Sequence, residues 1–304
     1  MKINCPNLKC LISKNPGPKC GSIVSNGSYY RSSDSRKIRR YYCRCCKRYF
    51  SKATRSPCYL QKKRRINSSL KRLLCSGVSQ RRAARILKVN PKTVVRRFRF
   101  LAHQARLEHQ EWLTYYKQFP LQAIQFDDLE TSEHTKCKPL SVALAIDPKH
   151  RKILNFQVAI MPAKGHLSKM AIKKYGYRKD KRGPAWDQMM RELKPFVEKN
   201  AIWTSDENPH YKNHLLRHHP DAIHIQMKGG RGAITGQGEL KKLKFDPLFM
   251  LNHTCAMLRA NLNRLFRKTW CTTKNQQGLK DHLDLFVSYF NGELTPLSAG
   301  KGGS

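Results

Sequence analysis

The run LQAIQFDDLE at residues 121–130 decides the fold class, because the pattern of the chain changes here from helical to extended. LSVALAID (140–147) and KILNFQVAI (152–160) follow after short polar turns, and the three runs are expected to pair as an antiparallel meander. The later segments are predicted as a helix over 186–196, a strand over 201–206, a helix over 211–219 and a strand over 222–225. The sequence therefore predicts an α/β domain over residues 119–292.

This order of elements is the one expected of an RNase H-like domain, in which the first and fourth strands are neighbours. Asp127 lies inside the first predicted strand and Asp206 at the carboxyl end of the fourth, so the two carboxylates are expected to meet. Two buried carboxylates repel each other unless cations lie between them. A pair of Mg²⁺ or Mn²⁺ ions would remove this conflict and create a site for phosphodiester chemistry. An acid at a strand end faces solvent or caps a helix at least as often as it ligates a metal, and this alternative stands for Asp206.

Asp128 directly follows Asp127 in the first strand. Side chains alternate along a strand, so these two acids face opposite sides of the sheet and only one can be catalytic. The alternation by itself does not choose between them.

The charge of the chain indicates a nucleic-acid partner. Its 304 residues hold 60 Lys and Arg against 20 Asp and Glu, a formal charge of +40. Residues 1–107 alone carry 29 of the cationic side chains and one acid, Asp34. Such an excess is expected to be neutralised by a polyanion. No signal-like or long apolar segment occurs, which argues against a membrane partner, and we expect a soluble cytoplasmic or nucleoid-associated protein.

Eleven cysteines without a secretory signal are interpreted as metal ligands and buried thiols. Cys5 with Cys10, and Cys43 with Cys46, form two close pairs, as in a zinc ribbon whose two knuckles share one Zn²⁺ ion. The alternative is unliganded thiols in a basic arm. Cys20 or Cys45 could replace one of these four cysteine ligands.

Short alternating segments between the cysteine pairs predict small strands, with AsnGly at 26–27 as a hairpin turn. Together these features predict a zinc-ribbon-like module over residues 1–60. A module this small and polar is expected to depend on its metal for stability.

Residues 61–118 carry the pattern of an all-α helix-turn-helix domain. A first helix is predicted over 67–75, Ser79 is expected to cap a second, and Asn90 with Pro91 to begin a third. A basic third helix fits the major groove of DNA, whereas the alternative is a solvated charged face. The residues predicted to contact DNA are Arg81, Lys92, Arg96, Arg97 and Arg99.

Three motifs carry a family resemblance: FDDLE at 126–130, TSDENP at 204–209, and MLRANLNRLFRKTW at 257–270, which is interpreted as a late helix. On these motifs the chain from about residue 3 to 292 resembles DDE-type transposases of small bacterial insertion sequences. The resemblance implies zinc-binding and helix-turn-helix modules before an RNase H-like catalytic domain. It also implies that Asp127, the first acid of its pair, is catalytic rather than Asp128.

The resemblance further implies that a third acid opens the late helix, seven residues before a basic residue. If Arg259 is that basic residue, the third position is Asn252, an amide instead of a glutamate. An amide oxygen can still ligate Mg²⁺. The candidates for the third ligand are therefore ranked Asn252, Glu239, His253 and Asp246. The residues expected to position substrate phosphate are Arg259 and Lys268.

The expected activity is binding of the terminal inverted repeats of a mobile DNA element, followed by metal-dependent strand cleavage and transfer to target DNA. Because two ends must be held together, a homodimer or larger synaptic assembly is expected. The alternatives are an inactive, transposase-derived DNA-binding regulator, a nuclease without strand joining, and an RNA-associated zinc protein. Residues 298–304 are interpreted as an artificial linker.

Overall fold

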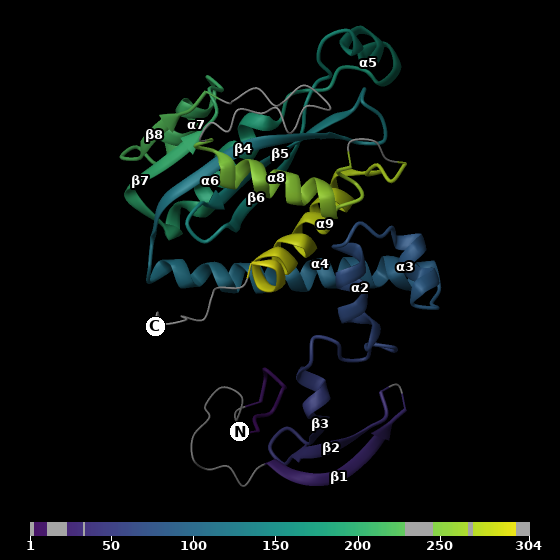
Figure 1. Ribbon diagram of the computed structural model, residues 1–304. Coiled ribbons are helices and arrows are strands. Elements are labelled where there is room, and N and C mark those ends of the chain that lie inside the picture. Colours follow the sequence, from purple (N-terminus) through teal and green to yellow (C-terminus); the bar gives the residue numbers. More distant parts are fainter. Residues whose placement is uncertain (1–2, 11–22, 33, 229–245, 267–269, 296–304) are drawn as a thin grey trace, which may run out of the picture. The chain divides into compact units, whose positions relative to one another are not determined.

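The computed structural model describes residues 3–10, 23–32, 34–228, 246–266 and 270–295 (Figure 1). The chain divides into two compact units, Met1–Ser69 and Leu70–Ser304, which are described separately.

The first unit contains a three-stranded antiparallel sheet in the order β1-β2-β3. Its strands are β1 (Ile23–Arg31), β2 (Arg36–Cys43) and β3 (Arg48–Ser51), followed by a short 3-10 helix over Lys52–Arg55. The hairpin predicted at AsnGly 26–27 is wrong. Gly27, at φ 64°, lies within β1 at an irregularity between Ser25 and Ser28, so its left-handed backbone forms a bulge instead of reversing the chain.

The second unit is built on a five-stranded mixed sheet in the order β6-β5-β4-β7-β8. Its strands are β4 (Leu121–Ser132), β5 (Pro139–Asp147), β6 (Lys152–Ile160), β7 (Val197–Ser205) and β8 (Ile223–Gln226). Strands β4, β5 and β6 are antiparallel neighbours, whereas β7 pairs parallel to β4 and β8 parallel to β7. The predicted meander and the two later strands are therefore confirmed as strands, and the predicted α/β class holds.

The α-helices within the described residues are α2 (Ile66–Leu74), α3 (Gln80–Ile86), α4 (Pro91–Leu113), α5 (Leu167–Tyr175), α6 (Arg182–Leu193), α7 (Tyr211–His218), α8 (Phe249–Asn261) and α9 (Gln276–Tyr289). Short 3-10 helices follow α4 at Thr114–Lys117 and α6 at Lys194–Phe196, and a π-helical turn follows α9 at Phe290–Leu294. Helices α5 and α9 were not predicted from the sequence.

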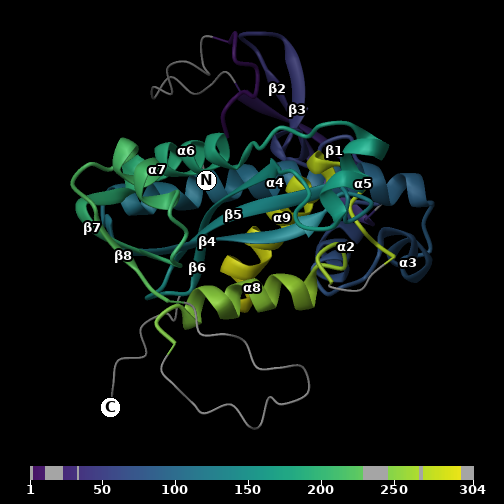
Figure 2. The same ribbon diagram turned by 90° about the horizontal axis from the view of Figure 1, so that it is seen from above.

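The sheet of the second unit is covered on both faces, and alternation along β4 assigns residues to each. Phe126 faces the side of α6 and α7 and packs with Trp186 and Leu215. Leu129 faces the other side and belongs to a larger cluster with Leu251 of α8 and residues of α9. Figure 2 shows α6 and α7 on one side of the sheet and α8 on the opposite side. The side chain of every second β4 residue thus points toward α8.

Helices α2, α3 and α4 form as the sequence predicts. Ser79 caps α3 by accepting a hydrogen bond from Arg82 N at 3.3 Å, and Asn90 caps α4 by accepting one from Lys92 N at 2.8 Å. On α4, Val95 is 37% exposed. Its two neighbouring core positions, Val94 and Phe98, are buried.

These three helices share one hydrophobic cluster with the sheet and with α8 and α9. Leu70, Ala83 and Phe98 belong to the same cluster as Leu258 and Leu283. The compact unit that begins at Leu70 accordingly includes α3 and α4 together with the sheet. The long α4 continues past its predicted DNA-reading part and packs on α9.

The late helix differs from its predicted range of 257–270. Helix α8 begins at Phe249 and ends at Asn261, because Leu262 has an extended backbone with φ −102° and ψ 109°. The carbonyl of Asn261 accepts a hydrogen bond of 2.6 Å from Gly77 N, in the turn between α2 and α3. Gly77 has φ 76°, and a Cβ there would lie 3.1 Å from the ring of Phe266. Only glycine fits this close approach without strain.

Candidate active site

The structure brings Asp127 and Asp206 together at the centre of the sheet. Strands β4 and β7 run parallel with Gln125 opposite Thr204, and each acid lies two residues beyond that pair. Burial, reinforced by the negative charge of Asp206, raises the pKa of Asp127 to about 7. Two carboxylates that share a partly dry site resist ionising together.

The protein engages each of these acids through one oxygen. Asp127 Oδ1 accepts hydrogen bonds from Asp128 N at 2.6 Å and from the Tyr211 hydroxyl at 3.3 Å. Asp206 Oδ1 accepts one from Asn208 N at 3.2 Å. Within the described part of the chain, the second oxygen of each acid accepts no hydrogen bond. Two fixed carboxylates with one free oxygen each are suited to ligate a divalent cation.

Asp128 faces the opposite side of the sheet, as alternation predicts. Its oxygens accept hydrogen bonds from Trp186 Nε1 of α6 at 3.0 and 3.1 Å, and burial raises its pKa. This acid therefore ties α6 to β4 and does not join the pair.

Gln125 fixes α8 against β4. Its side-chain amide donates to Pro247 O at 2.9 Å, and its oxygen accepts from Leu251 N at 3.2 Å. Gln125 and Asp127 lie on the same face of β4, so this bracket sets the start of α8 beside the acid pair. Its role was not foreseen from the sequence, because a lone glutamine in a strand carries no helix-contact signal.

Two candidates for the third ligand, Asn252 and Asp246, form one unit. The exposed Asn252 donates from Nδ2 to Asp246 Oδ2 at 2.8 Å, and Asp246 Oδ1 accepts from Leu248 N at 3.0 Å. Asp246 thus closes a turn immediately before α8, whose N-cap residue is Leu248. The hydrogen bond occupies the amide nitrogen of Asn252 and leaves its oxygen, the atom that can ligate a cation, available.

Of the two remaining candidates, the structure describes only His253. His253 contacts Arg151, with Nδ1 at 2.9 Å from the guanidinium, and burial together with that charge lowers its pKa. His253 therefore belongs to a contact with the β5–β6 turn. Glu239 lies outside the described residues, and so does Lys268.

Cys255, one turn after Asn252, is a neighbour of the acid pair that the sequence analysis missed. Burial raises the pKa of its thiol to about 12, and the charge of Asp127 adds to this rise. Cys255 lies three residues after Asn252, so both are on one face of α8. This spacing was present in the sequence and could have identified Cys255. Arg259 follows on the same face, seven residues after Asn252.

The predicted DNA-contacting residues are mostly exposed. Arg81 on α3 and Lys92, Arg96 and Arg99 on α4 are exposed, whereas Arg97 is half-buried. Four of the five side chains are therefore accessible to a ligand, and Arg97 is engaged within the protein.

A separate metal centre is indicated in the first unit. The sulfurs of Cys5, Cys10, Cys43 and Cys46 lie within 4.8 Å of one another, with Cys5 and Cys46 at 3.5 Å and Cys10 and Cys43 at 3.8 Å. A tetrahedral Zn²⁺ ion with bonds of about 2.3 Å separates its sulfurs by roughly 3.8 Å. These are the four predicted ligands, and they could hold a metal such as zinc. Cys45 is exposed outside the cluster, and Cys20 lies outside the described residues.

Comparisons with known proteins give no family. No protein-family model matches the chain, and a search of curated proteins finds no match. Among the described helices none combines the length and apolar character needed to cross a membrane.

Proposed function

We propose that this chain is a metal-dependent DNA strand-transferring enzyme of the DDE transposase type, with an RNase H-like catalytic domain. The observation that carries the proposal is the half-buried pair Asp127 and Asp206 on adjacent parallel strands, where desolvation of Asp127 and repulsion from Asp206 raise the pKa of Asp127 to about 7. The sheet order β6-β5-β4-β7-β8, with an antiparallel meander beside two parallel strands, is consistent with an RNase H-like domain.

The residues at the site fit divalent cations. Asp127 and Asp206 would hold Mg²⁺ or Mn²⁺ through their free oxygens, and Asn252 would offer its amide oxygen as a third ligand. When bound, such ions polarise a phosphodiester and lower the pKa of an attacking water or 3′ hydroxyl. Asp246 orients Asn252, Gln125 holds α8 in register with β4, and Arg259 positions substrate phosphate from the same helix face.

The exposed basic residues of α3 and α4 support DNA binding by the helix-turn-helix. In this proposal Arg81, Lys92, Arg96 and Arg99 contact the element's ends. The zinc-loaded four-cysteine module would supply a second contact with DNA. Holding two ends together requires at least two copies of the chain.

The test is strand transfer by the full-length, zinc-loaded protein on duplexes carrying the inverted repeats that flank its coding sequence, with Mg²⁺ or Mn²⁺. We expect joined products from the wild type and a loss on the order of a hundredfold or more for Asp127→Asn and Asp206→Asn. Asp221→Asn, which changes an exposed acid, serves as the matched control. Undiminished joining by Asp127→Asn would refute the proposed site.

A second candidate, a DNA-binding regulator without catalysis, is favoured by one observation. The third ligand position holds the neutral, exposed Asn252, which is already bonded to Asp246. For a regulator, the wild type would bind the repeats and yield no metal-dependent cleavage. The variant Asn252→Asp distinguishes the two, since it would increase cleavage by an enzyme and leave a regulator inactive.

A further inference from the structure

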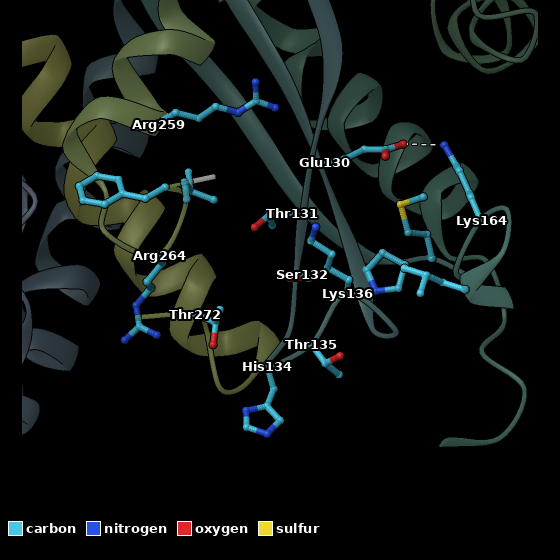
Figure 3. Close-up of a pocket in the computed structure, with 15 residues that line it drawn as sticks. Glu130, Thr131, Ser132, His134, Thr135, Lys136, Lys164, Arg259, Arg264 and Thr272 are labelled. Atoms are coloured by element: carbon cyan, nitrogen blue, oxygen red, sulfur yellow. Dashed lines mark hydrogen bonds and ion pairs between the residues drawn. The ribbon is translucent and has the colours of Figure 1, made fainter. Parts of the chain in front are cut away.

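A cavity of about 700 Å³ lies at the carboxyl end of β4 (Figure 3). One wall is formed by Arg259 near the end of α8 and by Arg264, Leu265, Phe266 and Thr272, and another by Met161, Lys164 and Leu167. In Figure 3, Arg259 extends from α8 toward the strand that carries Glu130 and Thr131. No part of this cavity includes Asp127 or Asp206, so it is distinct from the acid pair.

The lining is cationic and rich in hydroxyl donors. Four cationic side chains face one carboxylate, Glu130. The cations are Lys136, Lys164, Arg259 and Arg264, and the hydroxyls are those of Thr131, Ser132, Thr135 and Thr272. This combination suits phosphate oxygens, which accept hydrogen bonds from ammonium, guanidinium and hydroxyl groups alike.

The four cationic side chains differ in the hydrogen bonds and ion pairs that they make within the protein. Lys164 pairs with Glu130 at 2.6 Å. Arg264 donates to Thr273 Oγ1 at 3.4 Å and lies over the ring of Phe98. Lys136 and Arg259, in contrast, make no hydrogen bond or ion pair with any residue that the structure describes. Two unpaired cations that line one cavity are available to an anionic ligand.

The cavity lies in line with the acid pair. Asp127 and Thr131 are on the same face of β4, four residues apart, a span of about 13 Å at the rise of a strand. On α8, Arg259 lies seven residues beyond Asn252, about 10 Å along the helix. Along the axis of duplex DNA, which rises about 3.4 Å per base step, these spans correspond to roughly three to four steps, so the register takes the duplex axis as parallel to β4.

We propose that this cavity binds the sugar-phosphate backbone of duplex DNA, three to four base steps from the phosphate at the acid pair. Lys136 and Arg259 contact phosphate oxygens, and the hydroxyls complete the site. The register rests on the proposed function, because it takes the acid pair as the point of cleavage. Binding itself does not depend on catalysis.

The neighbouring surface favours an extended polyanion over a small anion. Helix α5, which follows the cavity wall, exposes Lys169, Lys173 and Lys174. A duplex backbone can contact the cavity and this helix together, whereas a single phosphate group would engage the cavity alone.

The first experiment measures the affinity of the full-length, zinc-loaded protein for a short DNA duplex of mixed sequence over a range of salt concentrations, without Mg²⁺. Each phosphate contact contributes about 0.9 to the slope of log affinity against log salt. We expect the double variant Lys136→Gln/Arg259→Gln to reduce that slope by about 2. The matched control, Lys149→Gln/Lys199→Gln, removes two exposed cations that lie outside the cavity and should leave the slope nearly unchanged.

A second variant is expected to bind DNA more tightly, so its result cannot come from damage to the fold. Glu130→Gln removes the single acid of the cavity and should tighten binding about two- to fivefold. Equal slopes for the cavity variant and its control, or no tightening by Glu130→Gln, would overturn the inference. A reduced slope combined with no strand transfer by the wild type would support the cavity and remove the proposed catalysis.

The register is tested on a duplex that the wild type cleaves. Neutral methylphosphonates placed about three to four steps from the cut should weaken binding by the wild type and have little effect on Lys136→Gln/Arg259→Gln. Equal sensitivity of both proteins would refute the assigned register.

Discussion

The two compact units of this chain are stabilised in different ways. In the first unit, the described buried apolar cluster consists of three cysteines, Tyr41 and Phe50. The second unit packs two large clusters against the faces of a five-stranded sheet. Burial of apolar surface can stabilise the second unit, whereas the first buries little of it, and a metal held by its four cysteines would add stability there. Four predictions sharpen this comparison, from the largest effect to the smallest.

Removal of the metal should unfold the first unit and leave the second intact. Structural zinc sites contribute about 10–16 kcal/mol of apparent binding free energy, more than a small module's entire stability. We expect chelation, or Cys43→Ser, to abolish amide-exchange protection in β1–β3 without changing that of β4–β6. Cys45→Ser, at an exposed thiol outside the cluster, is the control and should retain full metal content. Protection of β1–β3 in the metal-free protein would contradict the comparison.

Truncation of a core side chain should affect only the second unit. Leu144 is 1% exposed in the middle of β5, and Leu144→Ala should cost about 3 kcal/mol through lost burial and a cavity. Chemical denaturation monitored by tryptophan fluorescence measures this loss, since all four tryptophans lie in the second unit. Ile223→Ala, at a 51% exposed position of β8, should change stability far less. An equal loss at both positions would show that burial does not govern this unit.

Asp127, held beside Asp206, should lower the stability of the second unit at neutral pH. The pKa of Asp127 is about 7 when folded and about 3.9 when unfolded, so the folded state binds more protons between these values. Stability is therefore greatest below pH 4 with respect to this group and falls as pH rises through 7. Without divalent cations, Asp127→Asn should stabilise the protein by about 2 kcal/mol at pH 8 and by little at pH 4.

Denaturation of both proteins at the two pH values provides the measurement, with Asp221→Asn as the control. A gain for Asp127→Asn that is the same at pH 4 and pH 8 would show that the buried charge of this carboxylate is not its cause.

The smallest effect is expected at the cap of α4. Asn90→Ala removes the side chain that accepts from Lys92 N and should cost about 1 kcal/mol. Asn90→Asp preserves the acceptor and is the matched control. Thermal denaturation measures both, and equal melting temperatures for the wild type and Asn90→Ala would refute a stabilising cap.

Local patterns predicted the parts of the fold that depend on local chemistry. The strands around Asp127, the caps at Ser79 and Asn90, and the four-cysteine cluster follow from alternation, capping preference and ligand spacing. The end of α8 did not, because residues 257–270 retain apolar spacing after the backbone has become extended at Leu262.

The details of the candidate site depend on contacts between distant segments. Gln125 meets α8 across 126 residues of sequence, and no local pattern marks that contact. The pairing of Asn252 with Asp246 required knowledge of where α8 begins. Helices α4 and α9 share one core, which the sequence did not reveal because α9 itself was not predicted.

The hydrogen bond from Gly77 N to Asn261 O ties the last residue of α8 to the turn between α2 and α3. Gln125 holds the first turn of α8 and Gly77 its last residue, while Asn252 and Arg259 lie between these two points. Helix α8 is therefore anchored at both ends, and no loop lies between the two anchors. The turn between α2 and α3 and the strand that carries Asp127 are thus connected through one continuous helix.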